Sequence, residues 1–192
     1  MADRKEEIIQ AGIEVFAARG YYNTHIAEIV EKVGIAKGTF YLYFNSKKDL
    51  FISLIKRHEE IFLKEFDNYI IDTDNMDLKI FFEKMLLRFF KLYKKHENLS
   101  IIILREAVAV NEEFEDQFKK MDAKRFQSLN NLHQFLIENN YITKNIDFNY
   151  FACTFVGIME SIVMRRLILN EKDFDIEEAA DKISNYFYKA IS

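Results

Sequence analysis

The chain has 192 residues, of which 49% are hydrophobic and 30% are charged, the ordinary composition of a soluble globular protein. The net charge of −4 argues against a generally basic nucleic-acid-binding protein, although basic groups that converge on one face could still bind DNA locally. The single cysteine, Cys153, excludes an intrachain disulfide and is typical of a reducing cytosol.

Helix-breaking residues are rare and are concentrated near the N-terminus. The chain has no proline, and four of its five glycines lie within the first 38 residues. This distribution predicts an all-α protein of about nine helices, with short helices in the first fifth of the chain and longer ones after it.

The first helix is predicted to begin after a capping box formed by Asp3 and Glu6 and to end at Gly20. Thr24 is a typical N-cap for a second, short helix that ends at Gly34. A third short element is expected from about residue 36 to 44.

Longer helices are predicted in the rest of the chain. Ser46 and Asp49 form a capping pattern that opens a long helix, and residues 72–75 are expected to form a loop. A helix is then predicted through Phe81, Met85, Phe89 and Leu92, and a shorter one over about 99–110. A long helix is expected from an Asn111 cap to Asn139-Asn140, and two more over about 148–169 and 176–191, capped by Asp147 and by Asp175 with Glu178.

The second and third elements have the dimensions of a helix-turn-helix, in which the second helix of the pair enters the major groove. Gly34 supplies the positive φ that the tight turn requires. Lys37 and Tyr41 share one helix face, whereas Phe40 and Phe44 lie on the neighbouring face and are expected to anchor the helix in a core.

Other residues around this turn also suit DNA. Gly38 and Thr39 are small, so the backbone can approach base edges. Lys37, Tyr41, Tyr43 and Lys47 supply donors for phosphates, and Ser46 and Lys47 stand at a helix N-terminus, which favours anions. A solvated charged face is the alternative for each residue alone, but the ordered run of them favours DNA binding.

Residues up to about 50 resemble the TetR family of one-component transcriptional regulators. The resembling residues are Gly20-Tyr21, Thr24, Ile29, Gly34-Ile35, Lys37-Gly38-Thr39, Tyr41, Phe44, Ser46-Lys47 and Leu50. The resemblance implies a helix-turn-helix DNA-binding domain at 1–46 and a ligand-binding and dimerisation domain at 47–192. It also implies a cytoplasmic homodimer, most often a repressor, that binds a palindromic operator and releases it when a small apolar effector binds.

The resemblance also implies roles for individual residues. Thr24 and His25 would contact phosphates, and Tyr41, Tyr43 and Lys47 would do the same. Lys37, Gly38, Thr39 and Leu42 would face bases. Two residues depart from the family pattern, since Val30 stands where alanine is usual and His25 where serine or threonine is common.

The region after residue 50 is rich in phenylalanine, which at helical spacing is more often core than binding site. An apolar helical domain can nevertheless enclose a ligand, and the resemblance favours one here. The candidate ligand-binding residues are Phe62, Phe66, Phe81, Met85, Phe89, Arg105, Phe118, Met121, Phe126, Phe155 and Glu160. Glu160 interrupts an apolar run and needs a partner if buried, for which Arg105, Arg165 and Arg166 are candidates.

The last two helices resemble the dimer face of the family. Gly157 in mid-helix costs about 1 kcal/mol relative to alanine, which a closely crossing partner helix would explain. The candidate interface residues are Phe151, Phe155, Gly157, Ile158 and Ile162.

The effector and the function class leave alternatives open. The segment from Leu104 to Phe114 is similar to the fatty-acyl-CoA-responsive branch of the family, and a multidrug-responsive efflux regulator is equally compatible. An all-helical protein-interaction module without DNA binding is a third possibility. No catalytic or metal-binding spacing is present, so the sequence predicts neither an enzyme nor a cofactor, and no apolar run approaches the ~20 residues of a membrane span.

Overall fold

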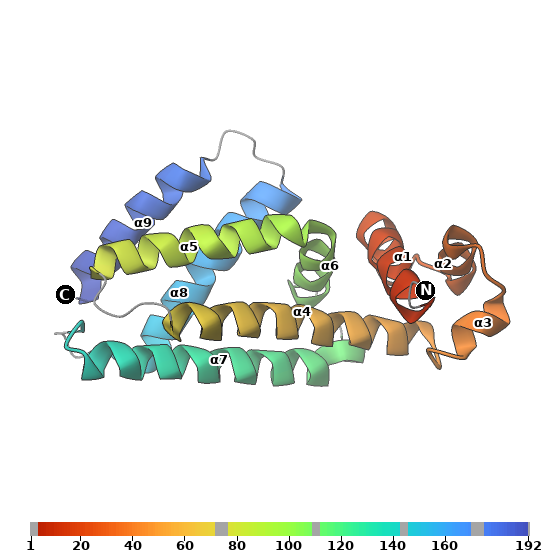
Figure 1. Cartoon of the computed structure of the whole chain (residues 1–192), viewed down its shortest axis with the longest axis horizontal. Helices are drawn as coiled ribbons and strands as arrows, with labels where there is room; N and C mark the ends of the chain where they lie inside the picture. Colours follow the sequence, from red (N-terminus) through yellow and green to blue (C-terminus); the bar gives the residue numbers. More distant parts are fainter. Residues whose placement is uncertain (1–3, 72–76, 109–111, 143–145, 170–174, 192) are drawn as a thin grey trace. The chain divides into compact units, whose positions relative to one another are not determined.

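The computed structural model of the chain describes residues 4–71, 77–108, 112–142, 146–169 and 175–191 (Figure 1). Within these ranges the chain forms nine α-helices and no strand, which confirms the predicted all-α fold. Asp3, Asn111 and the loop at 72–75 lie outside the described residues. The elements are α1 (Arg4–Arg19), α2 (Ile26–Val33), α3 (Lys37–Tyr41), α4 (Lys47–Ile71), α5 (Leu78–Lys95), α6 (Glu97–Val108), the 3₁₀ turn η1 (Glu112–Phe114), α7 (Glu115–Glu138), α8 (Phe148–Val163), the π-helical η2 (Met164–Ile168) and α9 (Ile176–Ile191).

The helices form two compact units. The first unit comprises the chain up to Ile61 together with His96–Met121, and the second comprises Phe62–Lys95 and the chain from Asp122 onward. The first unit therefore contains α6 and the start of α7 in addition to the three short N-terminal helices. The predicted division at residue 46 is a statement about function and stays a prediction.

Polar side chains cap the N-termini of several helices at the positions that the sequence predicts. Ser46 Oγ accepts the Asp49 N–H at 3.0 Å at the start of α4. The Asp147 carboxylate accepts the N–H two residues on at 2.8 Å, and Asp175 Oδ1 accepts the Glu178 N–H at 3.0 Å. These bonds satisfy N–H groups that have no partner within the helix.

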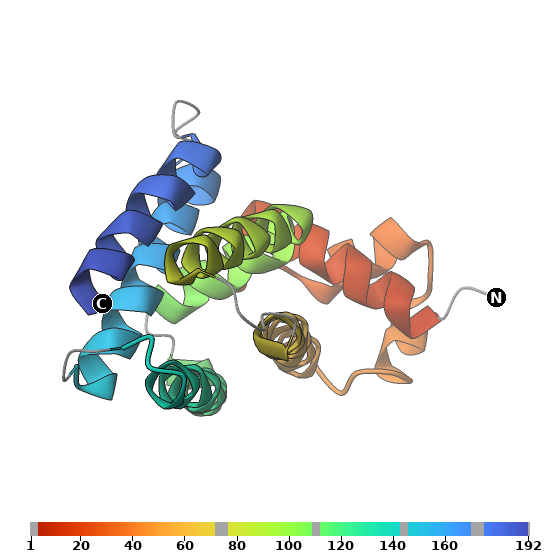
Figure 2. The same cartoon turned by 60° about the vertical axis from the view of Figure 1, so that its left-hand side comes forward.

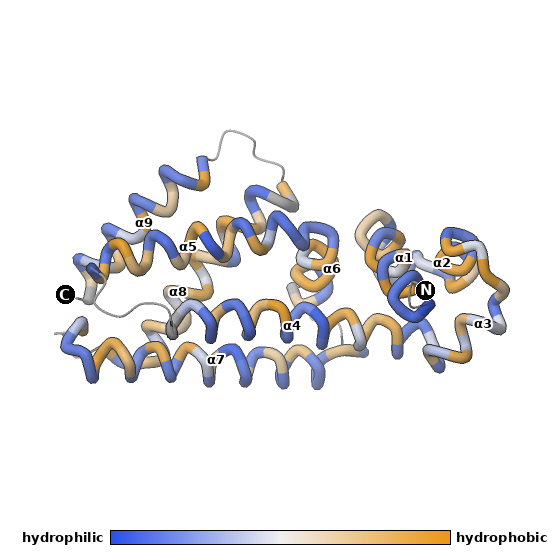
Figure 3. The backbone as a smooth tube through the Cα atoms, viewed as in Figure 1, coloured by the Kyte–Doolittle hydropathy of each residue, from blue (hydrophilic) through white to orange (hydrophobic). Residues whose placement is uncertain are grey.

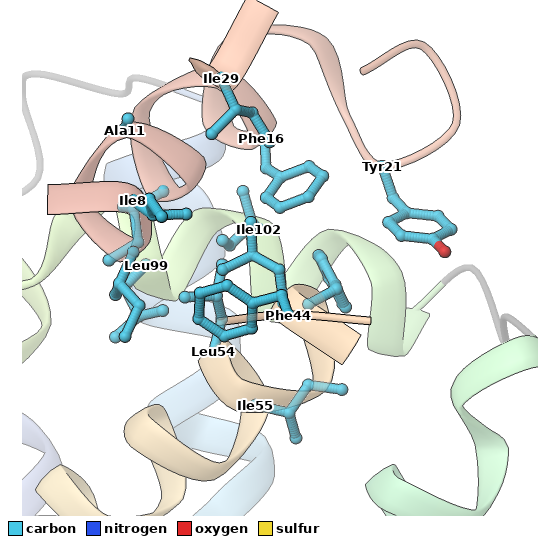
Figure 4. Packing of buried hydrophobic residues seen from close by; sticks show 14 of the residues in the cluster. Ile8, Ala11, Phe16, Tyr21, Ile29, Phe44, Leu54, Ile55, Leu99 and Ile102 are labelled. Carbon is cyan, nitrogen blue, oxygen red and sulfur yellow. The ribbon is translucent and has the colours of Figure 1, made fainter. Parts of the chain in front are cut away.

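The core of the first unit draws side chains from α1, α2, α3, α4, α6 and η1, and Figure 4 shows part of it. Phe16, Phe51 and Phe114 are fully buried, with ring centroids 5.2 Å apart for Phe16–Phe51 and 4.6 Å apart for Phe51–Phe114. Gly12 allows α1 to approach α4 closely, since a Cβ there would lie 3.0 Å from Leu50 Cδ2. The helix-turn-helix thus shares one core with α6 and η1.

The second unit has its own aromatic core. Helices α5 and α9 lie side by side in both views, and α8 also packs against α5 (Figures 1 and 2). Phe187 of α9 contacts Phe82 and Phe155, with centroid distances of 5.2 and 5.7 Å. Apolar and polar segments alternate along α4, α5 and α7, as expected of helices with one buried face (Figure 3). In the part of the chain that the structure describes, no helix is long and apolar enough to span a bilayer.

Candidate nucleic-acid interface

The turn between α2 and α3 has the geometry that the sequence predicts. Gly34 has φ +73°, and its N–H donates to Glu31 O at 3.0 Å. The Ile35 N–H donates to Val30 O, also at 3.0 Å. A left-handed residue with this pair of bonds ends α2 abruptly, so that α3 can follow at a steep angle.

Helix α3 has one buried and one exposed face. Phe40 and Phe44 are 0% and 3% exposed and hold the helix to the first unit's core, as predicted. Tyr41 and Tyr43 are exposed, and Leu42 is 81% exposed. The three consecutive side chains form an exposed patch, which points to a surface that contacts something else.

The remaining residues predicted to contact DNA from this helix are also accessible. Lys37 and Gly38 are exposed, and Thr39 is half-buried. No atom within 4 Å would obstruct a Cβ at Gly38, so the backbone there is open to a close approach. The Lys37 ammonium, the open backbone at Gly38 and the Tyr41 and Tyr43 phenols are therefore all accessible in and just after α3.

The start of α2 differs from the prediction. His25, not Thr24, is the N-cap residue, and its N–H donates to Glu28 Oε2 at 2.9 Å. Thr24 is fully buried, and its hydroxyl donates to Gly20 O at 2.8 Å. The structure therefore leaves His25 exposed at the start of α2 but does not present the Thr24 side chain to a phosphate.

Lys47 also points inward. Its Nζ donates to Tyr21 O at 2.7 Å and to Thr24 O at 2.9 Å, and it lies 4.4 Å from the centroid of the Tyr21 ring. Burial lowers the pKa of the Lys47 ammonium, while the Glu113 and Glu106 carboxylates act in the opposite direction. The predicted phosphate ligand at the start of α4 is engaged within its own unit.

Comparison with known families decides the class of this interface. The sequence profile described as "Bacterial regulatory proteins, tetR family" matches residues 8–54, which span α1, the helix-turn-helix and the start of α4. Residues 8–54 thus have the sequence of a TetR-family DNA-binding domain. The relatives that share this region are transcriptional regulators, and α3 is the second helix of the pair, the one that enters the major groove in helix-turn-helix proteins.

Curated transcriptional regulators extend the likeness beyond residues 8–54. The fatty acid metabolism regulator protein of Bacillus subtilis is 24% identical over 177 residues, which are 92% of this chain and 90% of the relative. The transcriptional regulator YerO of the same organism is 30% identical over 122 residues, 63% of this chain and 42% of the relative.

Solved TetR-family structures show the same fold. The fatty acid degradation regulator FadR of Bacillus halodurans has a TM-score of 0.85 at 21% identity, covering 98% of this chain and 96% of its own. FadR of B. subtilis, solved in complex with stearoyl-CoA, has a TM-score of 0.83 at 23% identity, covering 97% and 99%.

The residues predicted to bind an effector do not all belong to one unit. Arg105, Phe118 and Met121 lie in the first unit, where Arg105 donates to Ala17 O at 2.9 Å and the other two pack against the core. The others lie in the second unit, where all are buried except Phe126 and Glu160, which are half-buried; they are Phe62, Phe66, Phe81, Met85, Phe89, Phe126, Phe155 and Glu160.

Glu160 is paired with a residue that sequence reasoning missed. Arg125 Nη1 donates to Glu160 Oε1 at 2.6 Å, and its other Nη contacts Asp122. Burial raises the pKa of the nearby Tyr93 hydroxyl, and Glu160 raises it further. The i,i+3 spacing of Asp122 and Arg125 was the available signal for a structured arginine on α7.

The predicted dimer residues on α8 fall into two groups. Phe151, Phe155 and Ile162 are at most 5% exposed and pack inside the protomer's second unit. Gly157 is exposed, and a Cβ at this position would meet nothing within 4 Å, while Ile158 is half-buried. The exposed side of α8 instead carries small or polar residues, namely Tyr150, Cys153, Thr154, Gly157 and Ser161.

Proposed function

We propose that the protein is a ligand-responsive repressor that binds a palindromic operator as a homodimer. The observation that supports this most strongly is the arrangement of α3, where Phe40 and Phe44 are buried while Lys37, Tyr41 and Leu42 are presented outward. One such helix reads few bases, so two-fold symmetry supplies the second half-site.

The exposed side of α8 supports the dimer. A row of small residues that includes Cys153, Gly157 and Ser161 would let a second helix approach closely. Such an approach would explain a glycine in the middle of the helix, which otherwise only lowers helix stability. We place the partner helix on this side rather than on the side that carries Phe151 and Phe155.

We further propose a long-chain fatty acyl-CoA as the effector. The support is the whole-length similarity to a fatty acid metabolism regulator and the fold shared with FadR in complex with stearoyl-CoA. The second unit has an aromatic core in which Phe62 contacts Phe89 and Tyr93, and Phe89 also contacts Phe66; such apolar surroundings suit an acyl chain.

The experiment is fluorescence anisotropy of the purified protein on duplex DNA from upstream of its own gene, over a series of salt concentrations. We expect tight, competitor-resistant binding that weakens steeply with salt. Stearoyl-CoA should release the DNA, and coenzyme A alone should not. Weak binding at every salt concentration would contradict operator binding at that site, whereas binding that stearoyl-CoA leaves unchanged would contradict only the effector.

A further inference from the structure

Lys47 is engaged by the turn between α1 and α2. Its Nζ donates to Tyr21 O at 2.7 Å, to Thr24 O at 2.9 Å and to Tyr22 O at 3.4 Å. An ammonium group has three N–H donors and no acceptor, so three carbonyls occupy its whole hydrogen-bonding capacity. A phosphate could bind it only after one of these bonds had broken.

The carbonyls that Lys47 holds belong to a turn that cannot satisfy them itself. Gly20 ends α1 with φ +76°, and α2 starts only after His25. Tyr21 O accepts only one backbone N–H within the turn, from Thr24 at 3.3 Å, a long bond. Because the bonds to Tyr21 O and Thr24 O are partly shielded from water, losing them is costly, so the lysine stabilises the turn that sets where α2 begins.

Tyr21 fixes the same turn from the other side. Its hydroxyl donates to Glu113 Oε1 at 2.8 Å, and its N–H donates to Glu106 Oε1 at 3.4 Å. Its ring contacts Phe51 and Phe114 at centroid distances of 5.0 and 4.7 Å, with the hydroxyl pointing away from the aliphatic cluster (Figure 4). The turn is thus held between α4, α6 and η1, all within the first unit.

We infer that Lys47 is a positioning residue of the DNA-binding unit, which holds the α1–α2 turn from inside and neutralises no operator phosphate. The carboxylates of Glu106 and Glu113 balance its charge near the turn. Removing the ammonium frees three carbonyls at the entrance to α2, and the α2–α3 pair then loses its fixed orientation. This inference rests on the proposed operator binding.

The test compares Lys47→Met with Lys37→Met, the exposed lysine of α3, by measuring operator affinity as a function of salt. A lost phosphate contact lowers the slope of log K against log salt by about 0.9, or about 1.8 for the two copies in a dimer. We expect that decrease for Lys37→Met. For Lys47→Met we expect an unchanged slope and an affinity at least about tenfold weaker at every salt concentration.

The outcomes separate the inference from operator binding itself. A Lys47→Met slope that falls by about 1.8, with an affinity loss that shrinks at high salt, would overturn the inference in favour of a phosphate contact. Wild-type protein without salt-dependent operator binding would instead contradict the proposed function. A Lys47→Met protein with a lower melting temperature but wild-type operator affinity when folded would show that Lys47 only stabilises the fold, which would also overturn the inference.

Lys47→Arg covers the case in which Lys47→Met does not fold. Arginine keeps the positive charge, so a phosphate contact would survive with near wild-type affinity. The planar guanidinium cannot reproduce three bonds from one compact point, so a positioning role predicts weaker operator binding at an unchanged salt slope. Wild-type affinity for Lys47→Arg would contradict the inference.

Discussion

Both units contain ion pairs between side chains, but in the first unit charged side chains also bind main-chain groups. In the first unit, charged side chains bind main-chain groups of short helices and turns: Lys47 binds Tyr21 O, Arg105 binds Ala17 O, and Glu28 accepts the His25 N–H. In the second unit, ion pairs join side chains of long helices, as in Arg88–Glu65, Lys79–Asp181 and Arg125–Glu160.

The difference follows from helix length. A helix of five residues such as α3 leaves most of its N–H and C=O groups without internal partners, so side chains and buried rings must fix it. Helices of 16 to 25 residues pair most of their own backbone groups, so only their ends need such partners. Substitutions in the first unit should therefore change how DNA is read, and those in the second should change stability and association.

The largest effect is expected from a comparison of Phe40→Ala in the first unit with Phe82→Ala in the second. Both rings are fully buried, so each substitution should lower the free energy of unfolding by about 3–5 kcal/mol in urea titrations. Only Phe40→Ala should also abolish operator binding by the folded protein, because Phe40 anchors α3. Equal loss of operator affinity in both variants would contradict the separation of roles.

Gly157→Leu should weaken association without destabilising the protomer. The protomer has open space at Gly157, so the new side chain meets no obstacle within its own chain and improves helix propensity by up to about 1 kcal/mol. If a partner helix packs there, overpacking costs about 1–3 kcal/mol, and the dimer dissociation constant rises by about 5- to 150-fold in sedimentation experiments. A more stable protein with an unchanged dimer would place the interface elsewhere.

Tyr41→Ala should weaken operator binding without destabilising the fold. Tyr41 is 47% exposed, so its removal leaves no cavity, but a hydroxyl bonded to a phosphate contributes about 1.5 kcal/mol per subunit. Tyr41→Phe keeps the ring and isolates the hydroxyl, and anisotropy with a parallel melting curve measures both effects. A large drop in melting temperature would mean that Tyr41 belongs to the core.

The contrast also explains which features the sequence predicts. The positive φ of Gly34, the buried face with Phe40 and Phe44 and the Ser46 cap depend on residues within a few positions of each other. Local spacing therefore suffices to predict them. The same reasoning correctly predicts that Tyr41 lies on the surface.

Contacts between residues far apart in the sequence cannot be predicted from local spacing. Lys47 has the spacing of a phosphate ligand, but the carbonyls that hold it lie more than 20 residues earlier in the chain. Composition suggests other arginines as partners for Glu160, whereas its partner Arg125 is 35 residues away on α7. The inclusion of α6 in the first unit depends likewise on tertiary packing.

In the second unit, Tyr69 should make stability sensitive to alkali. Its hydroxyl donates to Phe81 O at 2.7 Å, and burial raises its pKa from 10.0 to about 12. The contribution of Tyr69 is fully present below pH 10 and is lost between pH 10 and 12, because the unfolded chain ionises first. Tyr69→Phe should reduce the loss of unfolding free energy by about 1 kcal/mol at pH 11. An unchanged alkaline profile would contradict the bond.

The smallest effect concerns Glu6, which braces α1 against α4 in the first unit. Arg57 donates to Glu6 Oε2 at 2.7 Å, and this bond lowers the pKa of the Glu6 carboxyl below its ordinary 4.5, although burial opposes the shift. A lowered pKa means that the contribution is present above pH 4.5 and is lost as the pH falls through the folded-state value.

The Glu6 side chain is 44% exposed, so solvent screens the ion pair. Its contribution to the free energy of unfolding is therefore about 0.5 kcal/mol. Glu6→Gln should therefore flatten the acid limb of stability slightly, measured by urea unfolding between about pH 3 and pH 7. Operator affinity at neutral pH should barely change, because this pair joins two helices side chain to side chain and holds no turn. A large loss of affinity would mean that even such pairs position the recognition helix, and the contrast between the units would then fail.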